Sequence, residues 1–154
     1  MKTARKTAGG AASGNITILL VDDNVHGMIA RRKVLEEQGY LIQTASSGEE
    51  ALQIFPRHPF DLMVTDFRMP GIDGVELISR LRALHVEIPV ILLSGFVEPL
   101  GMTEESTGAD AVLSKCAGEA AHLVRAVQRL LSRGRRKPLA TEKRPGTVYV
   151  AKSV

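Results

Sequence analysis

The sequence lacks the features expected of a secreted or membrane protein. Its single cysteine, Cys116, excludes a disulfide within the chain and fits a reducing compartment. No apolar run approaches the ~20 residues that a helix needs to cross a bilayer. The N-terminus is basic but contains no apolar block, so it does not resemble a secretory signal. These absences predict a cytoplasmic protein without membrane contact.

Charge is unevenly distributed along the 154 residues. Residues 15–132 contain 10 Lys and Arg and 16 Asp and Glu, a net charge of −6, whereas both ends are basic. Residues 1–14 are small, polar and basic, which predicts a disordered tail. Residues 134–154 contain two prolines and a basic run, and we expect a mostly flexible tail there, after one domain over 15–133. Because the basic residues lie in the tails, nucleic acid is not an expected partner.

Short apolar segments alternate with segments of helical periodicity. The apolar segments have the length of buried strands and lie at residues 16–23, 40–45, 60–65, 88–94 and 109–114. Helical segments follow at 24–39, 47–58, 74–85 and 118–134. The alternation predicts an α/β fold, in which a parallel sheet has helices on both faces. Between 95 and 108 the sequence contains Pro99 and Gly101, so we expect a short or distorted helix there.

Polar side chains stand at the ends of four predicted strands. The carboxyl ends of parallel strands share one edge of a sheet, where a crevice opens at the switch in strand order. Asp22 and Asp23 end the first strand, Asp66 the third, Ser94 the fourth and Lys115 the fifth. Three carboxylates repel one another unless a proton or a cation neutralises them. Oxygen ligands with room left for water suit Mg²⁺.

The same set of side chains could also accept a phosphoryl group. Such a group needs its negative charge neutralised and a nucleophile in line. Mg²⁺ and Lys115 would supply positive charge, and the Ser94 hydroxyl would donate to a phosphoryl oxygen. Asp66 is then left as the nucleophile, which would form an acyl phosphate.

Four motifs match a known family in order and spacing. The segments ILLVDDN, VTDFRMPGIDG, ILLSG and LSK resemble the receiver domain of bacterial two-component response regulators, over about residues 15–132. The resemblance implies a flavodoxin-like, doubly wound sheet of five parallel strands in the order 2-1-3-4-5. It also implies that a partner histidine kinase phosphorylates the protein.

The resemblance assigns a role to each candidate residue. Asp66 would be the phosphorylated residue, Ser94 the switch hydroxyl and Lys115 the phosphoryl-binding ammonium. The Mg²⁺ ligands would be Asp22, Asp23, Asp66 and the backbone carbonyl of Arg68. Arg68 and Phe96 would lie near the attacking water, and because both are bulky we expect slow self-dephosphorylation.

Three features depart from the family pattern. Val112 stands where the family usually has an aromatic ring that turns inward, so a readout by ring rotation is not available there. Cys116 follows Lys115 where the family usually has a proline after a cis bond, so this peptide bond is either trans or strained. Together with the distorted helix in 95–108, these positions belong to the family's usual output and dimer face. We therefore expect intact phosphorylation chemistry with an atypical output.

The expected function is that of a signalling module, not of an enzyme with its own substrate. Its phosphoryl group would come from a sensor histidine kinase or a histidine phosphotransfer protein. Output would pass through contact with a downstream protein or, in a homodimer, with a second copy of the chain, through phosphotransfer to a histidine phosphotransfer protein, or through the tail, because too few residues follow 132 for a DNA-binding domain.

Three alternatives belong to other classes. An aspartyl phosphatase typically has a second Asp two residues after the nucleophile, where this chain has Arg68. A flavin or nucleotide carrier would need a glycine-rich loop after the first strand, where this chain has an acidic one. A degenerate receiver, acting by protein contact without phosphate, is favoured by the altered segment from Val112 to Cys116 and disfavoured by the intact acids.

Overall fold

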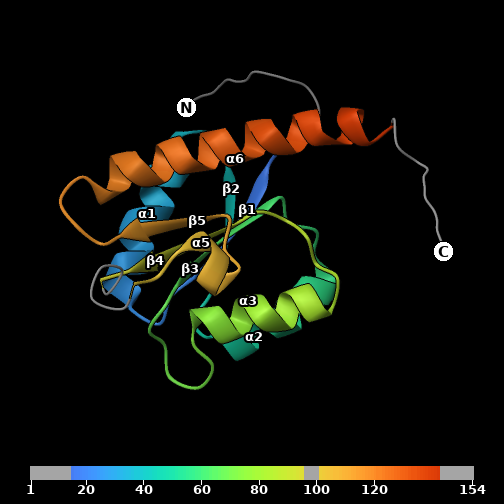
Figure 1. Cartoon of the computed structure of the whole chain (residues 1–154). Coiled ribbons are helices and arrows are strands. Elements are labelled where there is room, and N and C mark those ends of the chain that lie inside the picture. The colour runs from blue at the N-terminus through green and yellow to red at the C-terminus, as the bar shows by residue number, and fades with distance from the viewer. Residues whose placement is uncertain (1–14, 96–100, 143–154) are drawn as a thin grey trace.

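Five parallel strands form the centre of the computed structural model, which describes residues 15–95 and 101–142 (Figure 1). Their order in the sheet is β2-β1-β3-β4-β5, so the predicted fold and strand order are confirmed. The strands are β1 (Thr17–Val21), β2 (Leu41–Ala45), β3 (Leu62–Asp66), β4 (Val90–Ser94) and β5 (Ala111–Ser114). The order reverses beside β1, which is where open sheets of this kind bind their ligands.

Helices cover both faces of the sheet (Figure 1). One face carries α1 (Val25–Glu37) and α6 (Glu119–Glu142), and the other carries α2 (Gly48–Ile54), η2 (Phe55–Arg57) and α3 (Gly74–Ala83). Alternate residues of β1 point to opposite faces, so β1 contributes to two apolar clusters. The cluster under α1 and α6 contains Ile18 and Leu20, and the cluster under α2 and α3 contains Leu19 and Val21.

Short polar side chains begin the helices nearest the carboxyl edge of the sheet. Asn24 accepts a hydrogen bond from the Gly27 N–H at 2.8 Å and so caps α1. Asp73 accepts one from the Glu76 N–H at 2.8 Å and caps α3. Each contact satisfies one of the free N–H groups of a first helical turn.

Among the described residues between β4 and β5, the helix is short, as the sequence predicted. It is α5 (Glu104–Thr107), which the Thr103 side chain caps and which ends at Gly108 with φ of 79°. Residues 96–100, which include Phe96, and the predicted N-terminal tail over 1–14 lie outside the described part of the chain. No helix among the described residues is long and apolar enough to cross a membrane.

One helix boundary differs from the prediction, and one helix is less buried than its apolar spacing suggests. We expected the last helix to end at Gly134 and a flexible tail to follow, but α6 continues to Glu142, and only residues 143–154 of that tail lie outside the description. Gly134 lowers helix stability by only about 1 kcal/mol, which is too little to end a helix by itself. Pro138, which also lies within α6, disfavours a helix interior, so the local sequence does not account for the last turns of α6. In α1, Val25 and Ile29 follow the apolar spacing, yet both are exposed, at 65% and 60%.

Candidate functional site

The register of the sheet brings the predicted site residues to one edge. Asp66 is the last residue of β3 and pairs with Leu93 of β4. Ser94, the last residue of β4, is buried, and its carbonyl accepts a hydrogen bond from the Lys115 N–H at 3.0 Å. Asp22 follows β1, and its N–H donates to the Ala45 carbonyl at 3.1 Å. Backbone hydrogen bonds of the sheet and its extensions thus fix the positions of these residues.

Three carboxylates lie together at this edge. Oxygens of Asp22, Asp23 and Asp66 all lie within 4.8 Å of one another. Asp22 and Asp66 are buried, at 1% and 4% exposed, whereas Asp23 is exposed. Like charges at such spacing favour the uptake of a cation, and an all-oxygen set that is open on one side suits Mg²⁺. The donor set therefore fits the predicted ion, with Asp22, Asp23 and Asp66 as the residues that would hold it.

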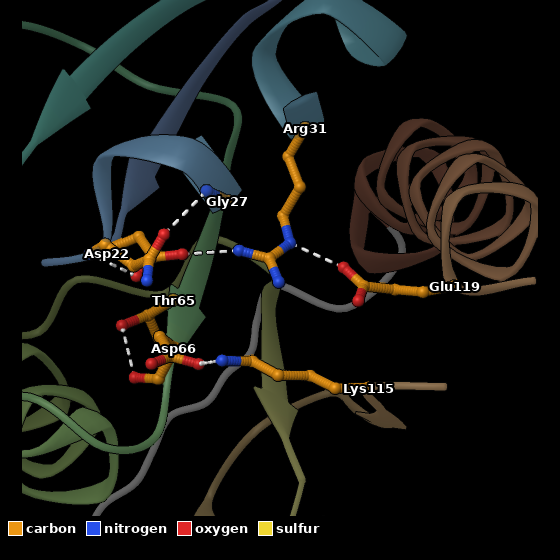
Figure 2. A network of polar contacts seen from close by, with 8 residues as sticks. Asp22, Gly27, Arg31, Thr65, Asp66, Lys115 and Glu119 are labelled. Carbon is orange, nitrogen blue, oxygen red and sulfur yellow. Dashed lines mark hydrogen bonds and ion pairs between the residues drawn. The ribbon is translucent and has the colours of Figure 1, made fainter. Parts of the chain in front are cut away.

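Lys115 points at the predicted phosphoryl acceptor (Figure 2). Its Nζ forms an ion pair with Oδ1 of Asp66. Burial raises the pKa of the Asp66 carboxyl, and this effect exceeds the lowering by Lys115. The Asp22 carboxylate raises it further. The negative form of Asp66 is therefore less favourable here than in water, and an additional positive charge would favour it.

Arg31 is the residue that sequence reasoning missed (Figure 2). It reaches from α1 to Oδ2 of Asp22, and its Nε donates to Oε2 of Glu119 in the first turn of α6. Burial lowers the pKa of the guanidinium, but the two carboxylates outweigh this effect and raise it overall. The only sequence signal was a charged residue on a largely polar helix, because its partners lie 9 and 88 residues away.

The remaining candidate residues surround this cluster. Arg68 is exposed and stands two residues after Asp66. The role of its backbone carbonyl as a metal ligand stays a prediction. Val112 is partly buried and packs against the apolar cluster under α2 and α3. The peptide bond between Lys115 and Cys116 is trans, as one of the two predicted alternatives required, and Cys116 is exposed.

Gly74 holds the start of α3 against the end of β3. A Cβ atom at this position would lie 2.4 Å from the Asp66 carbonyl oxygen and 2.7 Å from Cδ1 of Leu92. Only a glycine therefore permits this approach. The Asp66 carbonyl also accepts a hydrogen bond from the Thr65 hydroxyl at 3.1 Å. The backbone of the predicted acceptor is thus positioned by β3 and by α3 together.

Comparison with known proteins identifies the family. Residues 18–128 match the response regulator receiver domain, so the chain belongs to this family of two-component signalling domains. Sporulation initiation phosphotransferase F of Bacillus subtilis is 35% identical over 92 residues, which are 60% of this chain and 73% of that protein. The sensor kinase CckA of Brucella abortus is 38% identical over 88 residues, which are 56% of this chain but 9% of the kinase.

The solved structures include a receiver with a phosphoryl mimic. The response regulator protein TrrA of Thermotoga maritima, in complex with Mg²⁺ and BeF, is 32% identical with a TM-score of 0.67, covering 75% of this chain and 98% of TrrA. TrrA has also been solved in complex with the histidine kinase ThkA, with 34% identity to this chain, a TM-score of 0.67 and the same coverage.

Proposed function

We propose that this protein accepts a phosphoryl group on Asp66 in the presence of Mg²⁺ and signals through the resulting change in conformation. The observation that carries the proposal is the position of Asp66, which is buried at the end of β3, within 4.8 Å of two further carboxylates and ion-paired with Lys115. The proposed donor is a sensor histidine kinase or a histidine phosphotransfer protein. The complex of TrrA with ThkA supports a kinase as the partner of a related receiver.

Each residue has a defined task in this reaction. An oxygen of Asp66 bonds to phosphorus while the bond from phosphorus to the donor atom breaks, and with acetyl phosphate the leaving group is acetate. Lys115 neutralises a phosphoryl oxygen, and the Ser94 hydroxyl donates to another. Mg²⁺, held by Asp22, Asp23, Asp66 and the Arg68 carbonyl, would supply the remaining positive charge. After the transfer, the phosphoryl oxygens carry the negative charge that Asp66 carried before. Their contacts with Ser94 and Lys115 would then start the conformational change.

Phosphorylation by a small donor tests this proposal directly. The full chain, incubated with Mg²⁺ and acetyl phosphate, is expected to gain about 80 Da in intact mass, the mass of one phosphoryl group replacing a proton. Hydroxylamine should remove the added mass, because it cleaves acyl phosphates, and EDTA should prevent its appearance. A wild-type chain that gains no mass, or that gains it equally in EDTA, would contradict the proposal and favour a receiver that acts without phosphate.

Slow self-dephosphorylation is a separate expectation at the same site. The exposed Arg68 side chain stands two residues after Asp66 and would shield the phosphoryl group from water. Arg68→Ala should therefore shorten the half-life of the phosphorylated protein several-fold after acetyl phosphate is removed. Arg57→Ala, in η2, is the matched control and should leave the half-life unchanged. Equal half-lives for the wild type and Arg68→Ala would contradict the shielding role.

A further inference from the structure

The proposed function gives no task to the ion pairs of Arg31. Arg31 extends from α1 with its side chain only 11% exposed, and it contacts two carboxylates that belong to different elements (Figure 2). One is Asp22, at the carboxyl edge of the sheet, and the other is Glu119, in the first turn of α6. The guanidinium therefore links the candidate metal site to the start of the last helix.

Both oxygens of Asp22 are already engaged. Oδ1 accepts a hydrogen bond from the Asn24 N–H at 2.9 Å, and Oδ2 contacts Nη1 of Arg31. A cation that binds Asp22 would therefore approach an oxygen that already has a partner, which is a backbone N–H for Oδ1 and a guanidinium for Oδ2. The positive charge of Arg31 also repels a cation at this short range. Arg31 and a metal ion are thus competitors for one ligand.

We propose that Arg31 is the counter-cation of Asp22 in the metal-free protein, and that an incoming divalent cation takes this carboxylate from Arg31 and leaves the guanidinium with Glu119. This inference rests on the metal site of the proposed function. Arg31 then acts as a positioning residue that sets the affinity for the cation. Because Arg31 also contacts Glu119, binding of a cation to the metal site would change the contacts of the first turn of α6.

The surroundings allow the guanidinium to leave Asp22. Arg31 and Glu119 line an open surface groove of about 400 Å³ between α1 and the start of α6, together with Gly27, Ala30 and Cys116. A Cβ atom at Gly27 would lie 3.0 Å from Nη1 of Arg31 and 3.1 Å from Oδ2 of Asp22. The absent side chain at Gly27 therefore makes room for the contact with Asp22. Because this groove is open to solvent, Arg31 can withdraw into it without displacing atoms of the core.

The affinity for Mg²⁺, measured by isothermal titration calorimetry, tests the competition. Arg31→Met is expected to bind Mg²⁺ about tenfold more tightly than the wild type, because a competing charge is removed from the site. Arg32→Met is the matched control, since Arg32 is the next residue of α1 and pairs with Glu36 on the exposed face at 2.9 Å. It should change the affinity less than twofold.

Two outcomes would separate failure of the inference from failure of the site. If Mg²⁺ binds the wild type and Arg31→Met equally, the site stands and the role of Arg31 is wrong. If Mg²⁺ binds neither protein, the metal site of the proposed function is itself wrong, and the inference falls with it. Thermal unfolding of each variant in EDTA verifies that it is folded before the titration.

A double-mutant cycle with Glu119 distinguishes release onto α6 from a general effect of charge. Glu119→Gln should weaken Mg²⁺ binding several-fold in the wild-type background, because Arg31 then has no second carboxylate to accept it. In the Arg31→Met background, the same change should have little effect. Equal weakening in both backgrounds would indicate that Glu119 acts only through its distant charge, and it would overturn the proposed transfer of Arg31 to Glu119.

Discussion

Asp66→Asn is expected to abolish the gain of about 80 Da that acetyl phosphate produces in the wild type. An amide oxygen is a far weaker nucleophile than a carboxylate, and the substitution would also remove one of the three charges that favour a cation at this edge. Intact mass after incubation with Mg²⁺ is the measurement. The loss should be complete, because the neighbouring acids lie on a different strand end and would not take over the in-line position.

The same variant should also differ from the wild type in thermal stability when Mg²⁺ is absent. Burial raises the pKa of Asp66 in the folded protein. The unfolded chain therefore loses this proton first as the pH rises, so the wild type loses stability from about pH 4, the usual pKa of Asp, up to the folded pKa. An amide at this position does not titrate, so the variant has no such loss. At pH 7 in EDTA, Asp66→Asn should consequently unfold a few degrees above the wild type.

Asp61→Asn is the control for both measurements. Asp61 precedes β3 at the opposite end of the sheet, where its carboxylate accepts a hydrogen bond from the Thr17 N–H at 2.9 Å. This variant should be phosphorylated as the wild type is. If Asp66→Asn were labelled to the same extent as Asp61→Asn, Asp66 would not be the acceptor.

Gly74→Ala is expected to lower the free energy of unfolding by about 3 kcal/mol, near the upper end of the usual range for overpacking. The added methyl group would lie 2.4 Å from the carbonyl oxygen of Asp66. Because this oxygen belongs to the backbone, the clash can be relieved only if the end of β3 or the start of α3 moves. Such a loss corresponds to a decrease of about 10 °C in Tm. Thermal unfolding followed by circular dichroism is the measurement.

Gly95→Ala provides the matched control for this substitution. Among the described residues, a Cβ at Gly95 meets no atom within 4 Å, so this variant should unfold close to the wild type. A Tm for Gly74→Ala within about 2 °C of that for Gly95→Ala would show that the contact with Asp66 is not as close as the structure has it.

The fold and the acidic cluster were predictable because both depend on short segments. Each buried strand is a run of apolar residues, and a parallel sheet brings the ends of such runs to one edge. Asp22, Asp23 and Asp66 stand directly at those ends, so their meeting within 4.8 Å followed from topology. The same reasoning placed Lys115 beside Asp66, as the ion pair shows.

The features that could not be predicted depend on side chains of different elements. The contact between Arg31 and Glu119 joins residues 88 positions apart and follows no periodicity. The need for glycine at position 74 arises from the Asp66 backbone and Leu92, so no local pattern reveals it. Helix α6 passes Gly134 because the weak destabilisation by one glycine does not end a helix, but its continuation through Pro138 follows from no local preference.

The length of α6 has a mechanical consequence. Its 24 residues span about 36 Å at 1.5 Å per residue, about twice the length of a five-residue strand in the sheet beneath it. Glu119 joins its first turn to Arg31 of α1, and Leu123, Val127 and Leu130 pack it against the sheet. A tilt of about 5° at the first turn would displace the last turn by about 3 Å. A small rearrangement beside the acidic edge would thus be amplified at the far end of the rod.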